Sequence, residues 1–289
     1  MPSLQSLRRK ITSVKNTQKI TKAMKMVSAA KLKRAQARIL AARPYAVRVR
    51  ALLERVSQRV DRAAHPLFAK RQGNKVVVGV ITSDRGLCGA FNANVLRKAV
   101  EVLREQEARG AQVSVAIIGR KGIDFFKRRP WPIYRQWPGV FDRLTFEHAK
   151  DIGQDLIEAY TKGTFDTFYV VANEFKSVMQ QQVIAMKSLP LELEPAEAAP
   201  GPVEGGGYLY EPSGKEFLDK LPELMYVLVY RRLLESSAAE QAARMTAMDG
   251  AVRNAGELIK RQTLYYNKTR QAAITKELMD IVGGAEALR

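Results

Sequence analysis

The feature that most constrains this chain is a helix-forming pattern that runs, with few interruptions, from about Leu218 to the last residues. A helix of roughly 65 residues spans on the order of 100 Å, whereas a small domain is only about 30 Å across. Such a helix cannot be buried within its own domain. Residues 1–55 form a second candidate of the same kind. We therefore expect a shaft, which favours a mechanical or bridging role over a catalytic one.

The start of the chain is strongly basic. Residues 1–50 hold fourteen lysines and arginines but no aspartate or glutamate, and the whole chain carries a formal net charge of +19. A solvated helix normally intersperses opposite charges at i and i+4, which this segment does not do. The charge indicates an acidic partner, which could be nucleic acid, anionic lipid or an acidic protein surface.

Arginine-rich, acid-free starts are also typical of mitochondrial presequences. Presequences are usually shorter, whereas here the helical pattern continues to about residue 60 with one break, at Pro44. The first residues lack the apolar core of a secretion signal. No uninterrupted apolar run approaches the roughly 18 residues of a spanning helix, so we expect none.

The spacing of apolar residues predicts the paired face of the first helix. Leu4, Leu7, Ile11 and Val14 follow one another at spacings of 3, 4 and 3. Beyond them we expect the seam to move to Ile20, Met24 and Val27, and to include the small residues Ala23, Ser28, Ala29 and Ala30. Pro44 lacks a backbone donor, so it should kink or interrupt the helix near Ala42. The helix should end near residues 65–66.

The second helix shows a cleaner repeat. A first frame, with the 3,4 spacing of a coiled-coil seam, consists of Met245, Met248, Val252, Ala255 and Ile259. After a shift in register, a second frame consists of Leu264, Asn267, Gln271, Ile274, Leu278, Ile281, Ala285 and Leu288. The amides of Asn267 and Gln271 either set the register of the seam or face a partner.

Between the helices the hydrophobic pattern alternates between strands and helices. We expect strands at 75–82, 112–118, 166–172 and 179–189, and helices at 90–107, 121–127 and 146–160. This alternation predicts an α/β fold, with a Rossmann-like βαβ domain and a mostly parallel sheet covered on its faces. Residues 195–207 have the composition of a flexible loop. The expected domains are 1–65, 66–213 and 214–289, the outer two being the long helices.

Residues 83–92 (SDRGLCGAFN) follow a predicted strand and precede a predicted helix, a place where phosphates often bind. Gly86 and Gly89 suit a tight turn, and Arg85 could pair with an anion. The segment is nevertheless neither GxGxxG nor a GK[ST] loop. We expect a structural turn here rather than a phosphate site, and the same for residues 119–122.

Catalytic and metal-binding residue types are scarce. Cys88 is the only cysteine, and His65 and His148 are the only histidines. A nucleophilic thiol needs a base, and the sequence supports neither histidine in that role, so we expect an inert thiol. No set of His, Cys or Asp has metal-ligand spacing. We therefore expect no catalytic site, no metal and no cofactor.

Three segments, in this order, resemble the gamma subunit of F-type rotary ATP synthases, most closely the bacterial members. They are residues 16–27 (NTQKITKAMKMV), 83–89 (SDRGLCG) and 274–287 (ITKELMDIVGGAEA). The last segment has Glu277, Asp280 and Ala287 at the family's offsets. The resemblance covers essentially the whole chain.

The resemblance implies that the terminal helices form a long antiparallel coiled coil inside a hexamer of alternating alpha and beta subunits, with the central domain below it. It implies a non-catalytic central rotor that couples transmembrane proton flow to ATP synthesis on partner beta subunits. The implied partners are the alpha and beta subunits of the catalytic hexamer, the epsilon subunit and the ring of c subunits. The implied location is the cytoplasmic face of the bacterial plasma membrane, as a peripheral protein held only through the complex.

The resemblance also implies partner-contact residues. Arg270 and Gln271 match positions that hydrogen-bond a loop of one beta subunit, a contact made and broken in each turn. Met24, with Lys25 beside it, lies in a segment where energy coupling is sensitive to added charge. The acid-free helix would run past an acidic lever loop on each beta subunit. The tip, which would turn in an apolar bearing, consists of Leu278, Ile281, Ala285 and Leu288.

Two other functions are open on the residues alone. A nucleic-acid-binding adaptor would use the basic helix and bind with steep salt dependence. Its first fifty residues contain one aromatic, Tyr45, which argues against base stacking. An enzyme built on the βαβ domain would need a site that the sequence does not show. With the resemblance, we expect the rotor and no nucleic-acid partner.

Overall fold

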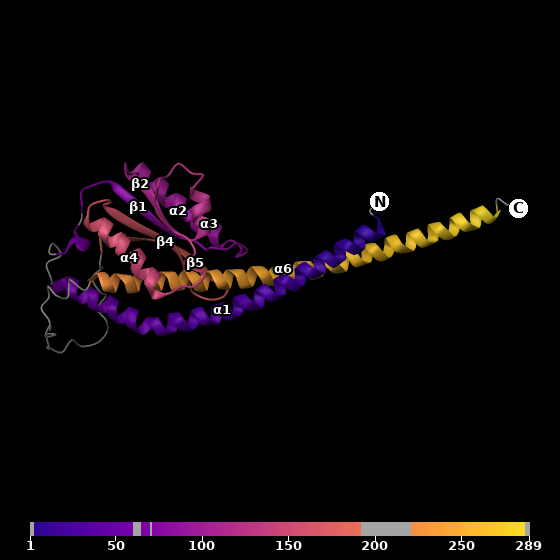
Figure 1. Cartoon of the computed structure of the whole chain (residues 1–289), viewed down its shortest axis with the longest axis horizontal. Coiled ribbons are helices and arrows are strands. Elements are labelled where there is room, and N and C mark those ends of the chain that lie inside the picture. Colours follow the sequence, from indigo (N-terminus) through magenta and orange to yellow (C-terminus); the bar gives the residue numbers. More distant parts are fainter. Residues whose placement is uncertain (1–2, 60–64, 70, 192–220, 287–289) are drawn as a thin grey trace. The chain divides into compact units, whose positions relative to one another are not determined.

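The computed structural model describes residues 3–59, 65–69, 71–191 and 221–286, with the backbone alone for 43, 45–59 and 284–286. The chain divides into two compact units, one of Met1–Ala29 with Arg244–Arg289 and the other of Ala30–Ala243. Figure 1 shows the elements. Among the described residues, no helix is both long and apolar enough to cross a lipid bilayer.

Two long helices carry the terminal sequences, as expected. Helix α1 spans Leu4–Arg59 and helix α6 spans Leu221–Glu286. The expected interruption near Ala42 is wrong, because α1 continues through Pro44. Proline costs one backbone hydrogen bond, and Ile39 and Ala42, just before it, pack against the core of the second unit and hold the helix in place.

The second unit contains a five-stranded sheet in the order β3-β2-β1-β4-β5. The first four strands run parallel, and β5 runs antiparallel to β4, at one edge. This confirms the expected mostly parallel sheet. The strands are β1 Lys75–Ile81, β2 Gln112–Ile118, β3 Ile133–Trp137, β4 Thr167–Phe175 and β5 Gln181–Leu189. Strand β3 was not expected, because it is a short edge strand whose side chains are partly exposed and polar.

Helices cover both faces of this sheet. Helices α2 (Phe91–Ala108) and α3 (Arg120–Phe126) pack on one face with Val76, Val78 and Val80 of β1. Helix α4 (Phe146–Thr161) and the first part of α6 pack on the other face with Val77 and Ile81. Alternate residues of one strand therefore contribute to two different cores, as a doubly covered parallel sheet requires.

The stretch of α6 that belongs to this unit is buried on nearly all sides. Leu233, Ala238, Ala239 and Ala242 are fully buried. Their mostly small side chains let neighbouring elements approach the helix closely. Ala239 packs with Phe91, at the start of α2, and with Cys88 in the loop after β1. The second unit thus holds this part of α6 firmly.

Candidate functional site

The first unit is built on antiparallel helix pairing. Lys25 of α1 contacts Asp249 of α6, whereas Gln18, earlier in α1, contacts Val252, later in α6. Positions on α6 therefore rise as positions on α1 fall. The antiparallel coiled coil expected from the resemblance is confirmed in this unit.

The paired face of α1 keeps one unbroken spacing of three and four residues. Its seam residues in this unit, all of them buried or half-buried, are Leu4, Leu7, Ile11, Val14, Gln18, Thr21, Lys25 and Ser28. The expected shift of the seam is wrong, because Ile20 and Val27 are 61% and 57% exposed, whereas Ser28 lies on the seam as expected. Met24 is half-buried beside the seam. Reasoning from apolar spacing failed here because polar side chains occupy the paired face.

The paired face of α6 also continues without a shift. Its seam residues, again all buried or half-buried, are Met248, Val252, Ala255, Ile259, Gln262, Tyr266, Thr269 and Ala273. The first expected frame is therefore on the seam, but the second is not. Leu264 is 72% exposed and Ile274 is 44% exposed, and Asn267 and Gln271 are exposed as well. As far as its side chains are described, up to Ile281, the second frame forms an outward stripe instead of a continuation of the coiled coil.

An ion pair lies at the edge of this seam. The Lys25 Nζ is 2.5 Å from the Asp249 Oδ1, and both side chains are about one-third to two-fifths exposed. Arg253 Nη1 lies 3.5 Å from the other carboxylate oxygen of Asp249. The hydrogen bond and the charge of Lys25, with a smaller contribution from Arg253, hold the pKa of the Asp249 carboxyl below its usual range.

A second polar contact crosses the helices nearby. Gln18 Nε2 donates a hydrogen bond to the backbone carbonyl of Val252, at 3.2 Å. Gly256 leaves room for the amide, since a Cβ at that position would lie 3.2 Å from Gln18 Nε2. Sequence reasoning missed Gln18 and Asp249. The available signal was the regular spacing from Leu4 to Ser28, which appears once polar residues are admitted to the seam.

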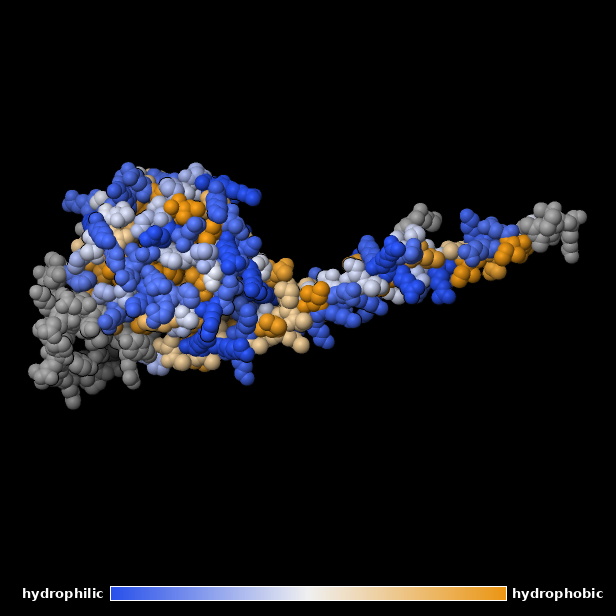
Figure 2. All heavy atoms as spheres, in the orientation of Figure 1, coloured by the Kyte–Doolittle hydropathy of each residue, from blue (hydrophilic) through white to orange (hydrophobic). Residues whose placement is uncertain are grey.

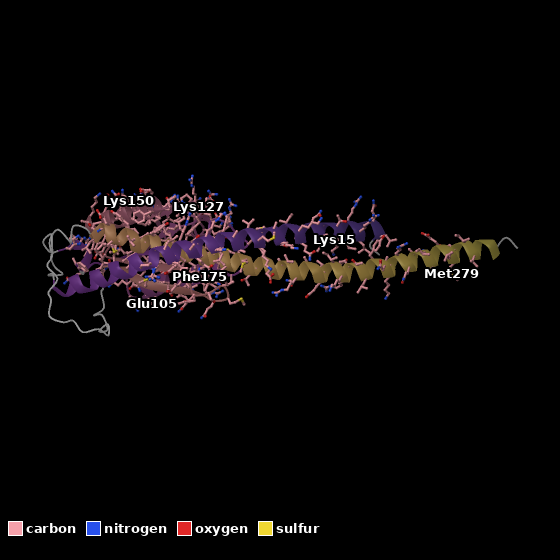
Figure 3. The ribbon with its side chains drawn as sticks, turned by 90° about the horizontal axis from the view of Figure 1, so that it is seen from below. Lys15, Glu105, Lys127, Lys150, Phe175 and Met279 are labelled. Carbon is pink, nitrogen blue, oxygen red and sulfur yellow. The ribbon has the colours of Figure 1, made fainter. Side chains whose placement is uncertain are left out.

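The last stretch of α6 has no covering partner among the described residues. Every residue from Ile274 to Gly283 is exposed, and the apolar side chains include Leu278 at 57% and Ile281 at 68%. Figure 2 shows hydrophobic atoms gathered along these turns, and Figure 3 shows Met279 projecting from the helix. A stripe of this kind on a single helix is typical of a surface that another protein covers.

The expected partner-contact residues fall in two separate places. Met24 and Lys25 lie level with Asp249, whereas Arg270 and Gln271 are exposed about 30 Å farther along α6, at about 1.5 Å per residue. The structure therefore does not bring these two groups together. Ala285 lies in α6 without a described side chain, and Leu288 lies outside the described residues.

In the central domain, the loop after β1 is closed by Asp84. Its Oδ1 accepts hydrogen bonds from the backbone N–H groups of Arg120 at 3.0 Å and Gly139 at 2.8 Å, and its Oδ2 accepts one from Phe141 at 2.9 Å. Asp84 is only 7% exposed. A carboxylate thus joins three backbone segments at the carboxyl edge of the sheet, which is a structural role.

The first N–H groups of α3 have protein partners as well. Those of Lys121 and Gly122 donate to the Ser83 carbonyl and the Thr82 Oγ1, at 3.1 and 2.8 Å. An anion at this helix start would have to displace them. The geometry therefore supports the structural turns expected at residues 83–92 and 119–122.

The single thiol is enclosed in the same loop. Cys88 is 2% exposed, and its Sγ lies 3.3 Å from Asn92 Nδ2. His65 and His148 each accept a hydrogen bond from a nearby backbone N–H, that of Leu67 and that of Thr145. Within the described residues, no group of three His, Cys, Asp or Glu side chains could hold a metal ion.

Comparison with known proteins agrees with this geometry. A family model described as ATP synthase matches residues 3–288. Two proteins named ATP synthase gamma chain, from Pelotomaculum thermopropionicum and Chlorobium phaeobacteroides, are 46% and 47% identical to this chain. Each match covers the full length of this chain and of the relative. The chain belongs to the ATP synthase gamma-chain family.

Solved structures support the gamma-chain fold. A chain of the Euglena gracilis mitochondrial ATP synthase is 25% identical, with a TM-score of 0.66, over 99% of this chain and 94% of that one. A chain from a Tetrahymena thermophila structure of the central stalk and c-ring is 25% identical, with a TM-score of 0.58, over 80% and 99%. The predicted fold, terminal helices joined to a central α/β domain, is confirmed.

Proposed function

We propose that this gamma chain is the central rotor subunit of a bacterial F-type ATP synthase. It couples transmembrane proton flow to ATP synthesis on partner beta subunits, by rotation, and performs no catalysis itself. Its partners are the alpha and beta subunits of the hexamer, the epsilon subunit and the c-subunit ring, and nucleic acid is not among them. It is peripheral at the cytoplasmic face of the plasma membrane, held there through the complex.

The observation that carries this proposal is the end of α6. Residues 274–283 are helical and all exposed, and they include Leu278 and Ile281. Exposed apolar side chains on a single helix are stabilised when a partner encloses them. We propose that Leu278, Ile281, Ala285 and Leu288 turn in an apolar bearing of the hexamer.

The basic charge supports the same assembly. The acid-free start of α1 keeps its lysines mostly on the exposed face, among them Lys15, which is labelled in Figure 3. Exposed charges attract an acidic surface over about one Debye length and without strict geometry. Such attraction suits a shaft that passes an acidic loop on each of three beta subunits. We keep 1–65, 66–213 and 214–289 as its proposed domains.

Rotation of single molecules tests the proposal. Cys88 is too buried to label, so the bead is attached through Lys127→Cys in a Cys88→Ser background. Lys127 is exposed just after α3, and Figure 3 shows it on the surface. With alpha and beta subunits and ATP, we expect stepwise rotation in one direction. Failure to enter the hexamer, together with DNA binding that falls steeply with salt, would overturn the rotor in favour of the nucleic-acid adaptor.

The contact assigned to Arg270 and Gln271 has its own test. Hydrogen bonds that involve a charged group contribute about 1.5–3 kcal/mol each. Arg270→Ala with Gln271→Ala should therefore lower ATP synthesis roughly tenfold or more relative to hydrolysis. The matched control is Lys260→Ala with Arg261→Ala, which removes exposed cations nearer the middle of α6. Equal coupling in the two double variants would refute the assignment.

A further inference from the structure

The seam of the first unit is polar where a coiled coil is most stable when apolar. From Gln18 to Ser28, each seam residue of α1 is polar or charged, while Ile20 and Val27 of the same segment face outward. Polar residues in a seam reduce stability but select one register, because their contacts are directional. An apolar seam tolerates a slip of one heptad far better than a polar seam does. After a shift of seven residues, its apolar side chains still pack against apolar side chains of the other helix.

Two independent contacts specify the same register. Gln18 reaches the backbone at Val252 and the space left by Gly256, and Lys25 reaches Asp249. Gln18 precedes Lys25 by one heptad, and Gly256 follows Asp249 by one heptad, as antiparallel pairing requires. The hydrogen bond and the ion pair therefore cannot both form in any other alignment.

This register decides where the paired section ends. Two further heptads in the same directions place Leu4, the first residue of α1, level with Arg270 of α6. The exposure of α6 agrees, because the half-buried residues on the seam stop at Ala273. Arg270 and Gln271 thus lie where the paired section ends and α6 continues without α1. A slip of one heptad would move α1 by about 10 Å along α6 and would cover these residues or carry α1 away from them.

We propose that Gln18, Lys25 and Asp249 are positioning residues, which set the axial register of the coiled coil and thereby leave Arg270 and Gln271 accessible at its end. This inference rests on the proposed rotor function for its consequence, but not for the register itself. The polar contacts favour this register over the neighbouring ones, because a slipped α1 would separate Lys25 from Asp249 and move Gln18 away from the space that Gly256 leaves.

Disulfide trapping in the isolated full-length chain, with Cys88→Ser, measures the register directly. The proposed register places Ile11 opposite the seam residue Gln262, and a slip of one heptad places it opposite Thr269. Ile11→Cys with Gln262→Cys should therefore form a disulfide readily under mild oxidation, and Ile11→Cys with Thr269→Cys should form at least about tenfold less.

Charge reversal then tests the ion pair. Lys25→Glu or Asp249→Lys alone should lower the in-register product several-fold and raise the slipped product. Lys25→Glu combined with Asp249→Lys should restore the original ratio. If either single variant keeps the original ratio, the pair does not set the register. If the combined variant is not rescued, Lys25 acts through another contact and the proposal also fails.

A seam made apolar separates register from stability. Gln18→Leu with Lys25→Leu should raise the melting temperature, because the seam becomes apolar, and yet lower the ratio of in-register to slipped product. If Gln18 and Lys25 only stabilised the fold, the melting temperature and the ratio of in-register to slipped product would change in the same direction. A higher melting temperature with an unchanged ratio would overturn the proposal. This variant also keeps the test open if a charge-reversal variant does not fold.

The assembled complex gives the functional readout. In membranes with the other subunits, Asp249→Lys should lower the ratio of ATP synthesis to hydrolysis several-fold, and the combined reversal should recover it. Normal coupling in Asp249→Lys alongside a slipped register would refute the link to Arg270 and Gln271. If the unaltered chain never rotates, the rotor function fails, whereas the disulfide result still decides the register.

Discussion

The ring of Tyr226 packs against Gly153, so closely that a Cβ at that glycine would lie 2.5 Å from the Tyr226 Cδ1. This contact brings the start of α6 against α4 beside the sheet. Gly153 is buried, and its lack of a side chain is what allows the approach.

Gly153→Ala should therefore lower the free energy of unfolding by about 1–3 kcal/mol, because overpacking outweighs the better helix propensity of alanine. Denaturant unfolding of the isolated chain measures it. The matched control is Gly250→Ala, also helical, where a Cβ would meet no atom within 4 Å. That variant should be stabilised by about 0.5–1 kcal/mol, so equal effects at the two sites would contradict the packing argument.

Removal of the Asp84 carboxylate should destabilise the central domain. Asp84→Ala leaves the N–H groups of Arg120, Gly139 and Phe141 without their acceptor, and each unpaired buried group costs about 1–3 kcal/mol. We expect denaturant unfolding to show a total loss of about 2–4 kcal/mol, since water can reach part of this loop. Asp142→Ala removes a more exposed carboxylate, paired with Arg85 and Arg120, and should cost under about 1 kcal/mol.

Loss of one hydroxyl should stabilise the chain. Ser236 is 1% exposed, and its Oγ has no hydrogen-bond partner within the part of the chain that the structure describes. Ser236→Ala removes an unsatisfied buried group and improves helix propensity. The free energy of unfolding should therefore rise by about 1 kcal/mol, which thermal unfolding would show as a higher melting temperature. Ser237→Ala, at a half-buried neighbouring position, gains propensity alone and should change less.

The Lys25–Asp249 pair should make coiled-coil stability depend on pH at the acid end. The pKa of Asp249 is lowered in the folded chain, so its contribution is fully present above the unfolded value of about 3.9 and is lost as the pH falls through the folded value. The difference in melting temperature between the original chain and Asp249→Asn should be constant from about pH 7 to pH 5. It should shrink below about pH 4, and also at about 1 M salt, since the pair is partly exposed.

Much of the central domain follows from its sequence because its strands are β-branched and buried, and its helices have clear apolar faces. Strand β3 could not be found in this way, since Arg135 and Gln136 at a sheet edge need not be apolar. The terminal helices were expected for a related reason, namely the length of their patterns. The exact pairing of these helices could not be predicted, because Gln18, Lys25 and Asp249 favour it through directional polar contacts. The spacing of hydrophobic residues does not report such contacts. The partner-contact residues came from family resemblance, and they stay predictions.

The ion pair between Lys25 and Asp249 joins residues 224 positions apart. A ribosome that adds about 5–20 residues per second needs roughly 10 to 45 s to reach Asp249 after Lys25. During that interval the basic first helix exists without its companion. Its dense positive charge, with the polar seam residues from Gln18 to Ser28, favours its staying in solution meanwhile. The polar seam residues that reduce the stability of the finished coiled coil thus also reduce the apolar surface that the unpaired helix exposes.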